Sequence, residues 1–87
     1  MNLNDLKSKL EKEGIAPHWY SLKGGLPNEA FCINQNSTNN WEVYYSERGQ
    51  KSALGVFEDE YYACFYFWNL ITSDPAVMKQ LNPQYKN

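Results

Sequence analysis

The N-terminal segment alternates leucines with charged and polar residues at the spacing of an amphipathic helix. Leu3, Leu6 and Leu10 recur every three or four residues, and the positions between them are polar or charged. This spacing places the leucines on one face of a helix. Asn2 is a suitable N-cap residue, and Gly14 has the conformational freedom that a helix end often requires. The pattern therefore predicts a helix that begins after Asn2 and ends before Gly14.

The middle of the chain changes to the two-residue alternation of β-strands. In the clearest segment, residues 41–47, Trp41, Val43 and Tyr45 alternate with other side chains, so one side is expected to face a core. Shorter apolar runs predict further strands at residues 18–22, 30–33 and 51–57. Glycines between the runs indicate tight turns, which favour an antiparallel meander. Gly55 lies inside the last run and predicts a β-bulge or a close backbone approach.

A second, longer helix is expected from about Glu58 to Thr72. The three acids at its start suit the positive end of the helix dipole. Six positions at helical spacing are expected to form its core face: Phe57, Tyr61, Cys64, Phe65, Trp68 and Ile71. Tyr62, Tyr66 and Phe67 lie off this face. Two alternatives stay open for this second stripe, which either packs under the C-terminal helix or remains partly exposed as a binding patch.

A short C-terminal helix completes the predicted fold. Asp74 is a suitable cap, Pro75 fits the first helical position, and Pro83 is expected to end the helix. The order of elements is then helix, three or four antiparallel strands, helix and short helix. The two main helices are expected to cover one face of the sheet. The sequence thus predicts a single α+β domain over residues 1–87, built as a two-layer sandwich.

Composition and charge narrow the class of protein. A chain of 87 residues forms one domain and has no room for a second core. The net charge of −2 argues against non-specific binding to duplex DNA, which needs a basic face. No apolar run approaches the ~20 residues of a membrane span, and the first residues lack the apolar segment of a signal peptide. We expect a cytoplasmic protein with no membrane or nucleic-acid partner.

Few side chains are suited to catalysis or to metal binding. The chain has one histidine, His18, and two separated cysteines, Cys32 and Cys64. A zinc site needs several clustered ligands, and a nucleophilic pair would have to use His18, which has no motif around it. Cys64 is expected in the core, whereas Cys32 is expected on the other side of the sheet from its neighbour Phe31. We therefore expect no enzymatic activity, no cofactor and no metal.

Two sets of side chains are candidates for a protein-binding surface. Glu42, Tyr44 and Arg48 lie on the outer face of the strand at 41–47 and are expected to see solvent if helices cover only the other face. The second set lies at the second helix and comprises Glu58, Asp59, Glu60, Tyr62 and Tyr66. Exposed Tyr and Arg often dominate binding energy, and carboxylates attract a basic partner. Three Trp, seven Tyr and four Phe exceed what one small core needs, which favours some exposure.

Several of these segments together resemble a group of small immunity proteins from bacterial polymorphic-toxin and contact-dependent growth-inhibition systems. The most specific part is the stretch Trp41–Gly49 (WEVYYSERG), followed by Phe57, Glu60 and the pair Ala63-Cys64. The remaining matches are Leu6-Lys7, Leu10, Ile15, Tyr20-Ser21-Leu22 and the run GGLPNE at residues 24–29. The resemblance covers roughly residues 3 to 68.

This resemblance implies a function without catalysis. Proteins of this group bind the C-terminal toxin domain of a cognate effector inside the producing cell and block its active site or its access to substrate. Many such toxins are nucleases with basic substrate clefts, which suits an acidic partner with a pI of about 5.2. The resemblance does not carry over contact residues, so the candidate positions rest on the residue analysis alone.

Other interpretations of the sequence share the same predicted fold. A small cytosolic interaction or regulatory domain without a toxin partner differs only in what it binds. A single-stranded nucleic-acid binder would use aromatic stacking but also needs a positive groove, and the lysines are spread along the chain. The sequence leaves the oligomeric state open between monomer and dimer.

Overall fold

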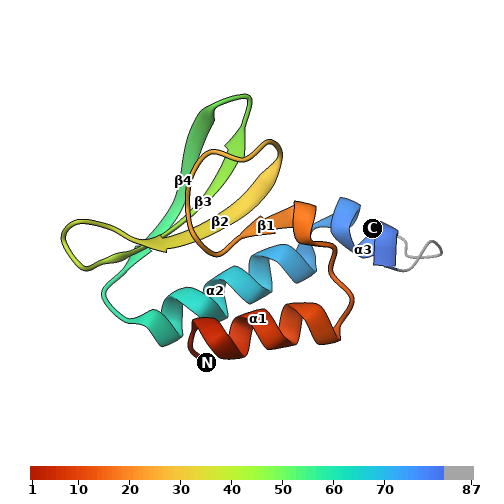
Figure 1. Cartoon of the computed structure of the whole chain (residues 1–87), viewed down its shortest axis with the longest axis horizontal. Helices are drawn as coiled ribbons and strands as arrows, with labels where there is room; N and C mark the ends of the chain where they lie inside the picture. Colours follow the sequence, from red (N-terminus) through yellow and green to blue (C-terminus); the bar gives the residue numbers. More distant parts are fainter. Residues whose placement is uncertain (82–87) are drawn as a thin grey trace.

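A computed structural model describes residues 1–81 and has the expected α+β architecture (Figure 1). The helices lie together on one side of a four-stranded sheet. The elements in chain order are α1 (Leu3–Lys12), the 3-10 turn η1 (Pro17–Trp19), β1 (Tyr20–Ser21), β2 (Ala30–Gln35), β3 (Trp41–Glu47), β4 (Gln50–Phe57), α2 (Glu60–Ser73) and α3 (Pro75–Leu81). The expectation that Pro83 ends the last helix lies outside the described residues.

Both ends of α1 follow the local rules that the sequence predicts. The Asn2 side chain accepts a hydrogen bond from the Asp5 N–H at 2.9 Å, and the Asp5 carboxylate accepts one from the Asn2 N–H at 3.2 Å. This reciprocal capping box satisfies two donors that a helix start leaves free. At the other end Gly14 has a φ of 76°, and the Ile15 N–H donates to the Leu10 carbonyl at 3.0 Å. This is the Schellman geometry expected for a glycine end.

The sheet has the order β1-β2-β3-β4, and its last three strands form the predicted antiparallel meander. The two-residue hairpin turn between β3 and β4 has positive φ at both Arg48 and Gly49, which matches the twist of the strands. The predicted irregularity at Gly55 is also confirmed. The register shifts there, and a Cβ at Gly55 would lie 2.8 Å from the Phe57 ring.

The first strand differs from the expected meander. β1 has only two residues and pairs with β2 in parallel, because Gly24 and Gly25 do not form a hairpin turn. Residues 22–29 instead make a longer loop that returns the chain to the same end of the sheet before β2 begins (Figure 1). Three positive φ values, at Gly24, Gly25 and Glu29, bend this loop. A Cβ at Gly24 would lie 2.9 Å from the Asn34 amide, so the loop packs tightly against β2.

The core lies between the sheet and α2, and α1 packs beside α2 (Figure 1). Its fully or nearly fully buried apolar residues are Leu6, Leu10, Ile15, Phe31, Ile33, Val43, Ala63, Cys64, Phe67, Ile71 and Val77. The expected core positions Trp41 and Tyr45 of β3 pack against this cluster and are half-buried.

The predicted core face of α2 is confirmed in part: Cys64 and Ile71 are fully buried, and Phe57 and Trp68 pack against the core. Tyr61 and Phe65, expected in the core, are each 59% exposed, whereas Phe67, expected off the core face, is fully buried. The physical reason is that α2 is apolar on nearly all sides, so periodicity alone does not choose the buried face. The small side chains of Ala63 and Cys64 let the helix approach its neighbours closely, and they mark the face that is buried.

Candidate protein-binding surfaces

The sheet set of candidate residues does not form one exposed surface. Tyr44 is only 2% exposed, and the neighbouring Ser46 is fully buried, so the expected solvent exposure of this face is wrong there. The reason is the loop at 22–29, which crosses the face opposite the helices. The Tyr44 hydroxyl donates a 2.7 Å hydrogen bond to the Gly25 carbonyl of this loop. Tyr44 therefore anchors the loop rather than offering itself to a partner.

Glu42 and Arg48 lie apart from one another on this side. The Glu42 carboxylate forms an ion pair with Lys51 at 3.0 Å, and the Lys51 ammonium also lies 4.5 Å from the centre of the Tyr44 ring. Arg48 sits at the exposed tip of the β3–β4 hairpin, where its N–H donates to the Asn28 side chain at 3.3 Å. The structure does not bring the three predicted sheet residues together as one binding site.

Burial also disfavours the charged forms of three ionisable side chains inside the molecule, Cys32, Tyr44 and Cys64. Burial, reinforced by the neighbouring Cys32, raises the pKa of Tyr44 to about 12. Burial is the main cause that raises the pKa of Cys64 to about 11, and the nearby negative charge of Glu60 adds to it. Burial also raises the pKa of the Cys32 thiol. Both cysteines are free. Because the thiolate is the reactive form, protonated buried thiols of this kind are inert structural residues.

Within the helix set, two of the three acids bind backbone N–H groups at helix starts. Asp59 is the N-cap of α2, and its carboxylate accepts the Tyr61 N–H at 2.8 Å. The Glu60 carboxylate accepts the Leu3 N–H at 2.8 Å and so ties α2 to the start of α1. Glu58 is exposed and precedes the cap. Of these carboxylates, Glu58 is the one most available to a partner.

Tyr66 has a structural role as well. Its side chain is half-buried, and its hydroxyl donates to the Leu54 carbonyl at 3.0 Å. Its ring lies against that of Phe57, with centroids 5.1 Å apart. These contacts attach α2 to β4, so Tyr66 does not belong with the exposed residues of the helix set.

Three aromatic side chains gather at the N-terminal end of α2 and remain exposed. Tyr61 and Phe65 are each 59% exposed and Tyr62 is 70% exposed, and together with Met1 they line a shallow hollow. We call Tyr61, Tyr62 and Phe65 the aromatic patch. The sequence analysis identified Tyr62 but missed the other two, which it placed in the core. The small residues Ala63 and Cys64 were the feature that could have located the buried face and hence the exposed one.

The charged side chains that the segment around α2 itself contributes are all negative. No Lys, Arg or His occurs between Ser52 and Met78, a stretch that contains Glu58, Asp59, Glu60 and Asp74. Positive charge on this part of the surface has to come from other segments. One such cation is Lys9 of α1, whose ammonium lies 4.7 Å from the centre of the Trp68 ring. The patch is therefore a cluster of exposed rings with carboxylates at its border.

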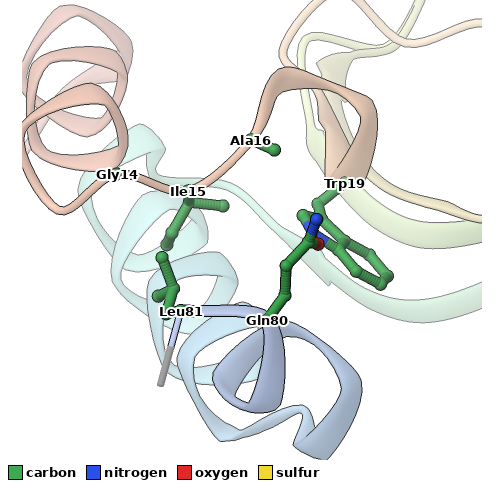
Figure 2. A pocket seen from close by; sticks show the side chains of 6 residues that line it. All are labelled: Gly14, Ile15, Ala16, Trp19, Gln80 and Leu81. Atoms are coloured by element: carbon green, nitrogen blue, oxygen red, sulfur yellow. The ribbon is translucent and has the colours of Figure 1, made fainter. Parts of the chain in front are cut away.

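A small pocket lies between the end of α1, η1 and α3 (Figure 2). Its lining comprises Gly14, Ile15, Ala16, Trp19, Gln80 and Leu81, and its volume is about 80 Å³. The Trp19 indole N–H donates to the Gln80 side chain across it. The volume is well below the roughly 300–1,000 Å³ of typical small-molecule sites, and the lining has no ionisable group. We interpret the pocket as a packing gap.

The remaining candidates for chemistry are dispersed. His18 is exposed in η1 and lies against the Trp19 ring, as expected for a surface turn residue. No group of three or more His, Cys, Asp or Glu side chains within residues 1–81 is placed to hold a metal ion. In the same range no helix is both long enough and apolar enough to span a bilayer.

Comparison of the chain with models of known protein families, with curated proteins and with solved structures returns no match. The functional argument therefore rests on the residues and the surfaces they form.

Proposed function

We propose that this protein is a non-catalytic immunity protein that binds a cognate bacterial toxin domain, most simply a nuclease, and blocks its active site or its access to substrate. The observation that carries the proposal is the aromatic patch of Tyr61, Tyr62 and Phe65, three large rings left in solvent beside carboxylates. The resemblance of the segments around Trp41–Gly49 and Ala63-Cys64 to small immunity proteins supports the same function.

The chemistry of the patch suits tight binding to a protein. Aromatic side chains supply much of the energy of protein interfaces, because they bury a large area and lose little conformational freedom. Complete neutralisation of a toxin calls for a complex of nanomolar affinity or better, about −12 kcal/mol. In the proposal Tyr61, Tyr62 and Phe65 supply most of this energy, as a central cluster from which the partner excludes water.

The acids beside the patch supply steering rather than affinity. A nuclease domain has a basic substrate cleft, and opposite charge on its partner raises the rate of encounter. Glu58 and Asp59 are both exposed at the start of α2, so both carboxylates face an approaching partner. The proposal places the complex in the cytoplasm of the producing cell.

The first test is capture of the partner from the producing organism with matched baits. The tagged wild-type chain and its Leu26→Ala variant are expected to retain one dominant protein, a large exported effector, through its C-terminal region. The double variant Tyr62→Ala/Phe65→Ala is expected to lose it. Leu26 is a suitable control because it is an exposed apolar side chain on the loop at 22–29, away from the patch.

Two outcomes of this experiment would argue against the proposal. Capture of a regulator as the dominant partner, while the effector is expressed, favours instead a small cytosolic interaction or regulatory domain. Retention of the effector by the double variant at wild-type yield would leave the immunity function standing but remove the aromatic patch from it.

A further inference from the structure

A shallow apolar hollow lies where the helical layer ends and the β3–β4 hairpin continues beyond it (Figure 1). Its floor is made by Phe31 of β2, Tyr45 of β3 and Leu54 of β4. Leu70 of α2 and Asp74, at the junction of α2 and α3, lie opposite this floor. The hollow is open to solvent, so it cannot enclose most of a small ligand in the way that small-molecule sites do. Its shape suits a side chain that a protein partner inserts.

The apolar floor of this hollow is held in place by contacts within the chain. Leu54 is the extra residue of the bulge in β4, and a bulge of this kind re-aims a side chain. Its carbonyl accepts the hydrogen bond from the Tyr66 hydroxyl at 3.0 Å, which fixes the bulge against α2. The rings of Phe31 and Tyr45 pack edge to face, with centroids 5.0 Å apart. The floor is therefore formed before any partner arrives.

The charged groups around the hollow are mostly carboxylates. Asp74 lines it directly, whereas Glu47 and Arg48 line an adjoining hollow that shares Tyr45 with it. Burial raises the pKa of Tyr45, and the negative charges of Glu29, Glu47 and Asp74 add to this effect. Three carboxylates and one guanidinium thus surround the Tyr45 side chain, and their sum is negative.

The carboxylate of Asp74 is oriented and still has an oxygen to offer. Its Oδ1 atom accepts the N–H groups of Ala76 and Val77 at 3.0 and 3.2 Å, which leaves Oδ2 for a partner. Within residues 1–81 the ion pair between Lys51 and Glu42 is the only one present, so none of the carboxylates around Tyr45 is neutralised by such a pair there.

This combination selects one kind of inserted side chain. An apolar side chain would cover the floor but would desolvate the Asp74 carboxylate without a partner, which is costly. An anionic side chain would be repelled. An arginine or lysine lays its apolar stem along the floor and brings its cation to the carboxylate and to the face of the Tyr45 ring. The hollow is therefore complementary to a basic side chain.

The hollow is continuous with the aromatic patch. Tyr62 of the patch, Tyr66 and Leu70 recur every four residues and so lie along one side of α2. The 14 residues of α2 span about 21 Å, which a standard interface of about 800 Å² on each partner covers. One partner can therefore contact the patch and the hollow together.

We infer that the hollow beside Tyr45 receives an arginine or lysine side chain of the toxin domain, whose stem packs on Phe31, Leu54 and Leu70 and whose cation pairs with Asp74. The identity of this partner rests on the proposed function. The preference of the hollow for a basic side chain does not, so the two are tested separately.

A peptide titration followed by NMR tests the preference of the hollow without any toxin. The probe is acetyl-Ala-Arg-Ala-amide, and the same peptide with glutamate in place of arginine is the control. The arginine peptide is expected to shift the backbone amide signals near Tyr45, Leu54 and Asp74 selectively, and the glutamate peptide is expected to leave them in place. Asp74→Asn is expected to lose most of the shift while it keeps the fold, because Asn caps a helix as well as Asp does. Shifts spread evenly over the surface, or unchanged in Asp74→Asn, would overturn the inference.

Affinity for the captured toxin domain tests the same contact in the complex. Asp74→Asn is expected to weaken binding by about tenfold or more, mainly through faster dissociation. Glu13→Gln, which removes one negative charge at an exposed position beyond the end of α1, is expected to bind like the wild type. Leu54→Ala is expected to weaken binding more than Leu81→Ala, although the two leucines are 38% and 39% exposed.

Double-mutant cycles identify the inserted side chain. Alanine replacement of one arginine or lysine of the toxin domain is expected to weaken binding to the wild type strongly and to Asp74→Asn only slightly. Capture of the effector with unchanged affinity for Asp74→Asn, or with no basic residue coupled to Asp74, would overturn this inference and leave the proposed function standing. Selective binding of the arginine peptide without capture of any effector would have the opposite meaning.

Discussion

At the scale of single residues, Tyr44 shows how burial changes what a polar side chain does. It lies opposite Cys32 in the sheet, and its hydroxyl donates to the Gly25 carbonyl. The hydrogen bond compensates for the burial of the hydroxyl and fastens the loop at 22–29 to the sheet. A tyrosine that looks in sequence like an exposed binding residue is therefore part of the structure's internal support.

Replacing this hydroxyl tests its role. Tyr44→Phe is expected to lower the free energy of unfolding at pH 7 by about 1 kcal/mol, the usual net value of one such hydrogen bond. Tyr62→Phe is the control, because the Tyr62 ring is largely exposed, and it is expected to change the free energy very little. Urea unfolding measures both. Equal stability of the two variants would contradict the anchoring role of Tyr44.

The same pair of variants predicts a pH dependence. The pKa of Tyr44 is raised from 10.0 to about 12 in the folded chain, so the unfolded chain releases this proton first. The stabilisation from Tyr44 is therefore complete below pH 10 and is lost as the pH rises from 10 toward 12. The difference in unfolding free energy between wild type and Tyr44→Phe is expected to shrink over this range. A difference that stays constant would contradict the raised pKa.

At the scale of elements, local rules predict where segments begin and end better than how they are placed. Asn2 and Gly14 determine the ends of α1 through hydrogen bonds within a few residues, so the sequence was sufficient there. The parallel pairing of β1 depends on the path of a whole loop. The burial of Tyr44 depends on the same loop, which packs across the sheet from a distant part of the chain. Neither effect leaves a periodic pattern in the sequence.

The orientation of α2 is the second part of the fold that the sequence did not determine. Because apolar residues surround most of the helix, the pair Tyr61 and Phe65 has the same four-residue spacing as the buried pair Ala63 and Phe67. Packing decides between such pairs, and the side with small residues approaches its neighbours most closely. The residues that remain exposed on α2 form the candidate binding surface. The wrong orientation expected for the helix therefore also placed two of the three patch residues, Tyr61 and Phe65, in the core.

Two phenylalanines of α2 test this orientation directly. Phe67→Ala is expected to cost about 3–5 kcal/mol of unfolding free energy, because Phe67 is fully buried and a cavity remains. Phe65→Ala is expected to change it by no more than about 0.5 kcal/mol, as for an exposed position. Chemical denaturation of both variants measures the difference. A larger loss for Phe65→Ala than for Phe67→Ala would reverse the orientation of the helix.

At the scale of the whole molecule, the starts of α1 and α2 lie side by side (Figure 1). The aromatic patch lies at this end, where it lines a hollow together with Met1. Asp5 at the start of α1 and Asp59 and Glu60 at the start of α2 stabilise the two helix starts and bring carboxylates to this end of the molecule. The far end of α1, about 15 Å away, carries Glu13 near its last turn. Charge and exposed aromatic area thus coincide at one end of a small domain.

This arrangement predicts an asymmetric effect of charge reversal on association with the captured partner. Glu58→Lys and Glu13→Lys change the net charge equally. Only Glu58→Lys, beside the aromatic patch, is expected to slow association markedly and to reduce its dependence on ionic strength. Stopped-flow association rates at several salt concentrations measure this. Equal effects of the two substitutions would show that net charge, rather than the position of Glu58, controls the encounter.

The most direct measurement of the central claim is growth of cells that express the captured toxin domain together with variants of this chain. The wild type and Leu26→Ala are expected to restore growth, whereas Tyr62→Ala/Phe65→Ala is expected to fail although it folds and accumulates to the same level. Full protection by the double variant would contradict the aromatic patch as the toxin-binding surface. Failure of the wild type to protect would contradict the immunity function itself.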